Sequence, residues 1–208
     1  MSRRPLTTTS FAILGLLAIR PWATYDLAKL MRRSLHFFWP RAESNLYAEP
    51  KRLVAAGLAE AREEWNGDRR RTVYSITEPG RDALREWLAT PPAGSRVESE
   101  AHLRLLYANY GSKDDLLRTL QSIEDDGQRT IDHYARLGTE YAHGEGLFPE
   151  RIHVNALIAS LSIEQARAAV RWARWARGAV EGWKTTRKPD VEWAAETMLR
   201  VAREPDDA

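Results

Sequence analysis

The side chains best suited to contact nucleic acid lie in one short stretch in the first half of the chain. This stretch offers a hydroxyl, an amide, a phenol and two cations, from Ser44, Asn45, Tyr47, Lys51 and Arg52. Such groups can reach both base edges and phosphates when they are presented in a major groove. The residue types therefore favour a surface that binds DNA.

Helical spacing would bring these side chains together. Apolar residues recur at the i, i+4, i+7 and i+8 positions of a buried stripe, namely Leu46, Pro50, Leu53, Val54 and Gly57. The polar residues then occupy the remaining surface, as in a DNA recognition helix. If Ser44 is the N-cap, Pro50 lies beyond the first turn, where it removes one backbone hydrogen bond and is expected to bend the helix.

A second group of cations, Arg69, Arg70 and Arg71, follows the pair Asn66-Gly67. Residues 58–65 and 72–76 have the pattern of strands, and Asn-Gly between strands is a strong hairpin signal because both residues tolerate positive φ. The arginines are therefore expected in the hairpin tip, from which they can reach phosphate or the minor groove. A basic tip that contacts nothing is the alternative interpretation.

Other helices are predicted on both sides of these two elements. One spans Ser10 to Ile19 with Ser10 as N-cap, and a second has Thr24 as its cap and residues 25–34 as its body. Residues 36–40, which follow, are too apolar for an exposed loop. Three helices followed by a hairpin make a winged helix-turn-helix.

A fourth helix is expected after the hairpin, with Thr77 as its N-cap. Its apolar face comprises Ala83, Leu84, Trp87 and Leu88. Residues 91–95 then form the clearest linker in the chain. The predicted organisation is a DNA-binding domain at 1–90 and a second domain at 96–208.

Composition limits the remaining function classes. The 208 residues include no cysteine, which excludes disulfides and thiolate metal sites, and no apolar run long enough to span a membrane. A cytoplasmic protein is therefore expected. Residues 1–90 hold 15 basic and 10 acidic side chains, whereas residues 91–208 hold 16 and 19. This asymmetry fits a first half that faces nucleic acid.

The second half has a helical pattern almost throughout. Helices are predicted at 98–110, from Ser112 to about Ala142, from Pro149 to about Trp183, and from the cap Asp190 to Arg203. The helix after Ser112 carries an apolar seam, so it needs a coiled-coil-like partner. The fold class is therefore mainly α, with a winged helix-turn-helix domain followed by an all-helical dimerisation domain.

A stripe of tryptophans marks the last long helix. Trp172, Trp175 and Trp183 share one face, and arginines lie between them. One interpretation is packing in a dimer, with the arginines solvated or stacked on the rings. The other is a pocket for a planar effector.

No set of residues has the spacing of a catalytic or metal site. The five histidines are scattered, and there is no metal-ligand pair, nucleophile elbow, phosphate-binding glycine loop or dinucleotide fingerprint. The acidic run 124–126 is interpreted as a solvated helix face. Neither an enzymatic activity nor a cofactor is expected.

The first half also resembles the PadR family of transcriptional regulators. The resemblance covers about residues 8–90 and rests on residues 12–17, 24–27, 38–40, 45–47 and 51–53, on Gly57-Leu58, and on residues 70–80. The helical second half is similar to that of the longer, Vir-type members. One departure is the proline, which the family commonly places directly after the tyrosine and which stands here at Pro50.

The resemblance implies a homodimeric winged-helix regulator that binds a palindromic double-stranded operator, usually as a repressor. It implies DNA contacts from Tyr47, Lys51 and the wing arginines, and we add a small aromatic effector as a hypothesis. Two alternatives stay open: a winged-helix module that binds proteins, and a helical ligand-binding protein without specific DNA binding.

Overall fold

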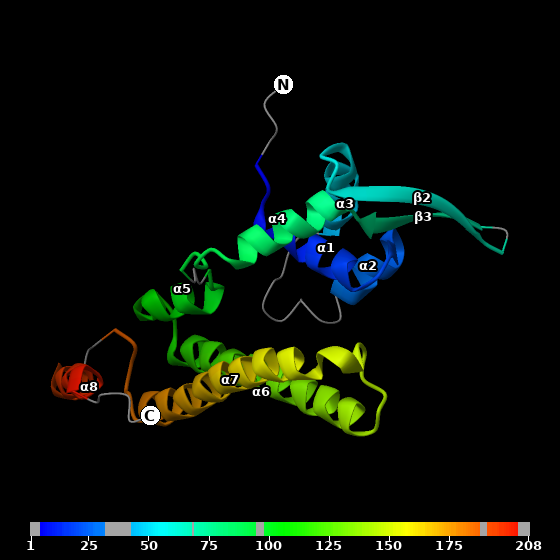
Figure 1. Cartoon of the computed structure of the whole chain (residues 1–208). Coiled ribbons are helices and arrows are strands. Elements are labelled where there is room, and N and C mark those ends of the chain that lie inside the picture. Colours follow the sequence, from blue (N-terminus) through cyan, green and yellow to red (C-terminus); the bar gives the residue numbers. More distant parts are fainter. Residues whose placement is uncertain (1–4, 32–42, 68, 95–97, 188–190, 204–208) are drawn as a thin grey trace. The chain divides into compact units, whose positions relative to one another are not determined.

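The computed structural model describes residues 5–31, 43–67, 69–94, 98–187 and 191–203 (Figure 1). The side chains of residues 43–46, 66, 69 and 201–203 lie outside this description, as does the apolar segment 36–40. The chain divides into two compact units, Met1–Ser95 and Arg96–Ala208. Each unit is described by itself.

The described part of the first unit has four helices: α1 (Thr8–Ile19), α2 (Thr24–Leu30), α3 (Glu43–Ala55) and α4 (Glu78–Leu88). The prediction that Ser10 caps the first helix is wrong. Thr7 is the N-cap, and the Ser10 hydroxyl accepts a hydrogen bond from the Thr7 backbone N–H in a capping box. Thr24 is likewise the first residue of α2, whose N-cap is Ala23.

A three-stranded antiparallel sheet completes the first unit. Its strands are β1 (Trp22–Ala23), β2 (Ala59–Asn66) and β3 (Arg69–Ile76), in the order β1-β3-β2. The hairpin of β2 and β3 extends away from the helices (Figure 1). Asn66 pairs with Arg69, and Gly67 opens the turn with a φ of 58°. The turn is therefore shorter than predicted, and the three arginines lie in β3 rather than in the tip.

The core of the first unit is aliphatic. Ile13, Leu14, Leu27 and Leu53 are fully buried, and Leu53 belongs to the apolar stripe predicted for the third helix. The predicted apolar face of α4 is covered only in part, since Trp87 stacks on Phe11 at 4.9 Å and Leu88 is 68 % exposed.

Helices alone build the described part of the second unit. The first are α5 (Glu100–Leu106), the short 3₁₀ turn η2 (Ala108–Tyr110) and α6 (Lys113–Ala142). They are followed by η3 (Pro149–Arg151), α7 (Ile152–Glu181) and α8 (Val191–Arg203). The N-cap of α6 is Ser112, the predicted start of this helix, and Ser112 and Asp115 bond reciprocally in a capping box.

The coiled-coil-like partner expected for α6 is α7 of the same chain, which runs beside it (Figure 1). Near one end of the pair, Leu116 and Leu120 pack in a cluster with Ala176 and Val180. Farther along, the Ser162 hydroxyl donates a hydrogen bond to the Tyr134 hydroxyl at 3.2 Å. The two helices therefore run antiparallel.

Gly127 lies where the two helices pack closely against each other. A Cβ at this position would lie 2.7 Å from Val170 Cγ2 and 3.0 Å from the Ala166 carbonyl oxygen. Both distances are below ordinary van der Waals contact, so any larger residue would push α6 and α7 apart. None of the described helices is long and apolar enough to cross a membrane.

Candidate nucleic-acid interface and aromatic hollow

The predicted recognition helix is α3, and its predicted apolar stripe is met only in part, since Val54 is half-buried and Gly57 is exposed beyond the end of the helix. Leu53 and Pro50 are buried, whereas Tyr47 is 38 % exposed and Lys51 is exposed. Tyr47 and Lys51 are four residues apart, so they lie on one side of the helix. Ser44 and Asn45 belong to the first turns of α3, but their side chains lie outside the described part.

Pro50 lies inside α3, which begins at Glu43 and continues beyond the proline to Ala55. The pyrrolidine ring is among the most deeply buried groups of the chain. Its burial in the core stabilises the helix at a position where proline costs about 3 kcal/mol relative to alanine in an ordinary helix. The bend expected at Pro50 stays a prediction.

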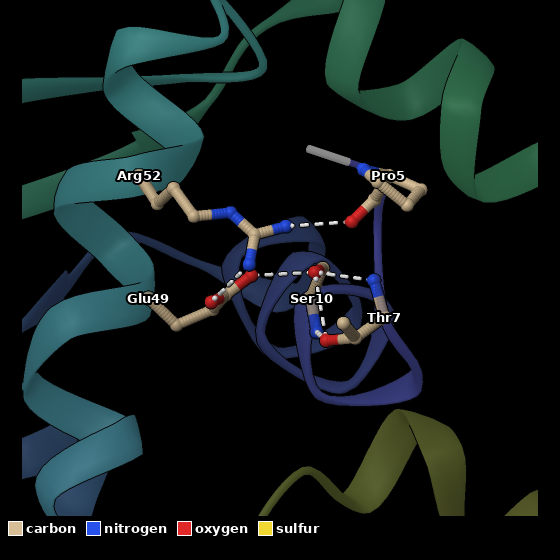
Figure 2. A network of polar contacts seen from close by, with 5 residues as sticks. All are labelled: Pro5, Thr7, Ser10, Glu49 and Arg52. Carbon is tan, nitrogen blue, oxygen red and sulfur yellow. Dashed lines mark hydrogen bonds and ion pairs between the residues drawn. The ribbon is translucent and has the colours of Figure 1, made fainter. Parts of the chain in front are cut away.

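Arg52 takes part in a polar network that joins α3 to α1 (Figure 2). Its Nη1 donates to the Glu49 carboxylate at 3.1 Å, and its Nη2 donates to the Pro5 carbonyl oxygen at 3.0 Å. The Ser10 hydroxyl donates to the other oxygen of the Glu49 carboxylate at 2.5 Å. Two donors of the guanidinium predicted to contact DNA are thus engaged within the protein.

Sequence reasoning missed Glu49. The residue is only 8 % exposed and lies three positions after Leu46, within the stripe predicted to be apolar. A carboxylate in a buried stripe requires a partner, because an unpaired buried charge is strongly unfavourable. That signal was present in the sequence, but its partner Ser10 is 39 residues away and only the fold brings it close.

The wing arginines are paired with acids of the neighbouring strand. Arg70 forms an ion pair with Glu63, and Arg71 forms one with Glu64 at 3.2 Å. Arg70 and Arg71 are consecutive in a strand, so they point to opposite faces of the hairpin. Trp65, directly opposite Arg70 in the register, is 72 % exposed. The side chain of Arg69 lies outside the described part.

This pairing changes the electrostatics expected of the wing. Residues 59–76 contain four basic and four acidic side chains, so the hairpin has no net formal charge. The arginines can bind phosphate through guanidinium N–H groups that the carboxylate does not engage, or by exchanging the carboxylate partner for a phosphate oxygen. Because the pairs are exposed, that exchange costs little, on the order of 1 kcal/mol or less for each pair.

A second candidate site lies in the helical unit. Trp172, Trp175 and Trp183 line one hollow of about 320 Å³, as their shared helical face predicted, and Trp193 of α8 joins them. Trp175 and Trp193 stack at 6.3 Å, and Trp183 meets Trp193 edge to face at 5.3 Å. The sequence did not associate Trp193 with the other three.

The arginines near the stripe have separate roles. Arg200 of α8, rather than an arginine of α7, lies over the Trp175 ring at 5.0 Å. Arg174 and Arg177 reach across to Glu124 of α6 at 2.6 Å and 3.1 Å. The Glu124 side chain is 12 % exposed, so the prediction of a solvated acidic face was wrong for this residue. Among the described residues, no group of acidic residues and histidines could hold a metal ion.

The winged-helix part of the chain matches a known family. Residues 13–86 match the model described as the transcriptional regulator PadR-like family. The chain carries a PadR-like domain. The family consists of transcriptional regulators, not enzymes. Over 107 residues the chain is also 28 % identical to the negative transcriptional regulator PadR of Bacillus subtilis, covering 50 % of this chain and 59 % of that protein.

Solved structures resemble more of the fold, at lower identity. Bacillus subtilis PadR in complex with operator DNA matches at a TM-score of 0.70 and 22 % identity, over 85 % of this chain and 99 % of that one. The same protein in complex with p-coumaric acid matches at 0.66 and 20 %, over 84 % and 99 %. The Vibrio cholerae virulence activator AphA matches at 0.61 and 23 %, over 83 % and 97 %. At these identities the likeness shows the fold: a winged helix with a helical second part.

Proposed function

We propose that this protein is a transcriptional regulator that binds a specific DNA site through its PadR-like domain. The observation that carries the proposal is the division of α3 into a face anchored by Leu53 and Pro50 and an exposed side bearing Tyr47 and Lys51. A phenol and a cation on a rigid helix can contact base edges and phosphates in a major groove. Ser44 and Asn45, also predicted to contact DNA, belong to the first turns of the same helix.

The wing is the second DNA-contacting element in this proposal. Arg70 and Arg71, with Arg69 beside them, supply cations that bind phosphate once their acidic partners are displaced. The exposed Trp65 next to Arg70 adds an apolar surface on the same face. The helix would therefore provide specificity, and the wing would provide general affinity.

The regulator is proposed to act as a homodimer on a palindromic operator. Supporting this, the segment from α5 to the end of η2 carries apolar side chains that are 57–80 % exposed: Leu103, Leu106, Tyr107 and Tyr110. Exposed apolar patches of this kind mark association surfaces. Two winged helices related by a dyad would read two half-sites about one helical turn apart. Sedimentation at micromolar concentration should give a dimer, and a monomer would remove this part of the proposal.

The DNA-binding proposal is tested with duplexes selected from a random pool by the full chain. Lys51→Ala and Tyr47→Ala should each weaken binding to the selected site by about tenfold or more, because each removes a contact worth roughly 1–3 kcal/mol. A matched control is Lys184→Ala, which removes an exposed cation of the other unit. Unchanged affinity for both α3 variants would show that α3 does not read the site.

Repression in the cytoplasm, relieved by a small aromatic effector, is the finer part of the proposal. It is supported by the name of the Bacillus subtilis relative and by the p-coumaric acid complex of that protein. In this chain the tryptophan hollow offers four indole rings and a nearby guanidinium to a planar anion. Packing of Trp172, Trp175 and Trp183 against a second subunit is the competing use of the same surface.

Titration with p-coumaric acid, followed by tryptophan fluorescence, separates these uses. Saturable quenching that is lost in Trp193→Ala, with the dimer intact, would support an effector site in the hollow. Dissociation of the dimer by the same substitution would support subunit packing instead.

The paired wing favours one alternative function, a winged-helix module that binds a protein. A hairpin without net charge attracts DNA less than three unpaired arginines would. Equal and weak binding of the full chain to every duplex in the pool, combined with tight binding to a protein partner, would establish this alternative.

A further inference from the structure

The polar network around Glu49 has an arrangement that simple DNA-binding electrostatics does not explain. Glu49 is an acid on the proposed recognition helix, between Tyr47 and Lys51 in sequence. An acid there should repel phosphates and weaken binding. The carboxylate is nevertheless 8 % exposed and accepts hydrogen bonds from two directions. Its place in the fold indicates a role inside the protein.

We infer that Glu49 is a positioning residue that holds α3 in the one orientation in which Tyr47 and Lys51 can read DNA. The inference rests on the proposed function. One carboxylate oxygen accepts the Ser10 hydroxyl of α1 at 2.5 Å, and the other accepts Arg52 at 3.1 Å (Figure 2). The bond from Ser10 forms only over a narrow range of depth and rotation of α3 against α1, whereas the Arg52 pair lies within α3 and holds the carboxylate in place.

The aliphatic contacts of α3 alone would not fix that orientation as sharply. Leu53 and Pro50 pack against the core, but apolar packing tolerates small rotations because it has no directional preference. A buried carboxylate that loses a partner is costly, so alternative orientations of the helix become much less populated. Apolar burial therefore stabilises α3 against the core without directional preference, and the polar network restricts the orientation of the helix.

The capping box extends this constraint to the start of α1. The Ser10 hydroxyl that donates to Glu49 also accepts the Thr7 backbone N–H at 2.8 Å. Arg52 closes the other side by donating to the Pro5 carbonyl oxygen at 3.0 Å. The segment before α1 and the middle of α3 are thus joined through one carboxylate and one guanidinium (Figure 2).

The same geometry changes the role expected of Arg52. Its charge is balanced by Glu49 at an ion pair whose side chains are 29 % and 10 % exposed. Replacing Glu49 with glutamine would leave this cation uncompensated, which should raise the attraction to any DNA. Positioning and electrostatics therefore predict opposite signs for the effect of Glu49→Gln on the selected site.

The experiment measures the affinity of the full chain for the selected duplex and for a scrambled duplex, at two salt concentrations. Glu49→Gln should weaken binding to the selected duplex by about tenfold. This factor corresponds to the free energy of one hydrogen bond to a charged group, at the low end of the usual range. Binding to the scrambled duplex should stay equal or become tighter. The matched control, Glu60→Gln, neutralises an exposed acid of β2 and should leave both affinities equal or slightly higher.

Each outcome decides between the possibilities. If Glu49→Gln binds the selected duplex as tightly as the unmodified chain while Lys51→Ala binds it weakly, the proposed function stands and the positioning role is refuted. If the unmodified chain selects no duplex, the proposed function itself fails. If circular dichroism shows that Glu49→Gln is unfolded, Ser10→Ala decides: it leaves the charge in place, so weaker specific binding supports positioning and unchanged binding overturns it.

Discussion

Two glycines of α6 allow the packing of the helical hairpin to be measured apart from helix propensity. Gly127 is buried against α7, whereas Gly138 is exposed and a Cβ added there would meet nothing within 4 Å. Alanine at either position gains about 1 kcal/mol of helix propensity. The difference between Gly127→Ala and Gly138→Ala therefore isolates the cost of the added methyl group at the helix crossing.

That cost follows from the contacts at Gly127. The new Cβ would lie 2.7 Å from Val170 Cγ2, and valine in a helix has one strongly preferred χ1 rotamer, so its methyl group cannot easily turn away. The second contact, at 3.0 Å, is with the backbone oxygen of Ala166 and can be relieved only by moving α7. Overpacking of this kind typically costs about 1–3 kcal/mol.

We expect Gly138→Ala to be more stable than the unmodified chain by about 1 kcal/mol and Gly127→Ala to lie about 1–3 kcal/mol below Gly138→Ala. Urea unfolding followed by far-ultraviolet circular dichroism measures both. Adding Val170→Ala to Gly127→Ala should cost less than Val170→Ala costs alone, because the clashing methyl group is gone. Equal stabilisation by the two glycine substitutions would refute the close approach of α6 and α7 at Gly127.

Three further predictions concern single positions. Gly80→Ala should destabilise the first unit by about 3 kcal/mol or more, measured by thermal unfolding, because its Cβ would lie 2.1 Å from the backbone oxygen of Leu58. Glu124→Gln should lower the free energy of unfolding by about 1–2 kcal/mol in urea, since its two arginine partners lose a largely buried carboxylate. An unchanged free energy would show that these pairs are only surface contacts. Hydrogen bonds from the Ser112 side chain and backbone, with Arg118 nearby, hold the pKa of Asp115 below its usual range. This stabilisation is present above the ordinary carboxyl pKa and is lost as the pH falls through the lowered one, so Asp115→Asn should flatten the drop in Tm below about pH 4.

Local sequence signals predicted much of the fold. The capping box at Ser112 and the glycine after His143 mark the ends of α6, and both signals act over a few neighbouring residues. Thr77 likewise caps α4 as predicted. Pro50 and Leu53 of the predicted apolar stripe are buried in α3, as expected. Signals of this kind are readable because the groups that interact lie within one turn of each other.

Other features depend on residues far apart in the chain. Strand β1 is only two residues long and exists because β3 supplies its hydrogen bonds. The wing arginines lie beside acids because the register of β2 and β3 places Glu64 opposite Arg71. Trp193 joins the hollow because α8 returns to α7. No local periodicity in the sequence predicts these contacts.

The sequence by itself determined the division into a winged-helix part and a helical part, the exposed Tyr47 and Lys51, and the tryptophan face of α7. The tertiary structure alone decided that Glu49 is buried, that Arg52 points inward, and that α6 is covered by its own chain. The physical reason is the same in each case. Helix faces and caps follow from backbone geometry within a few residues, whereas the partner of a buried charge or an apolar seam is chosen by how whole elements pack.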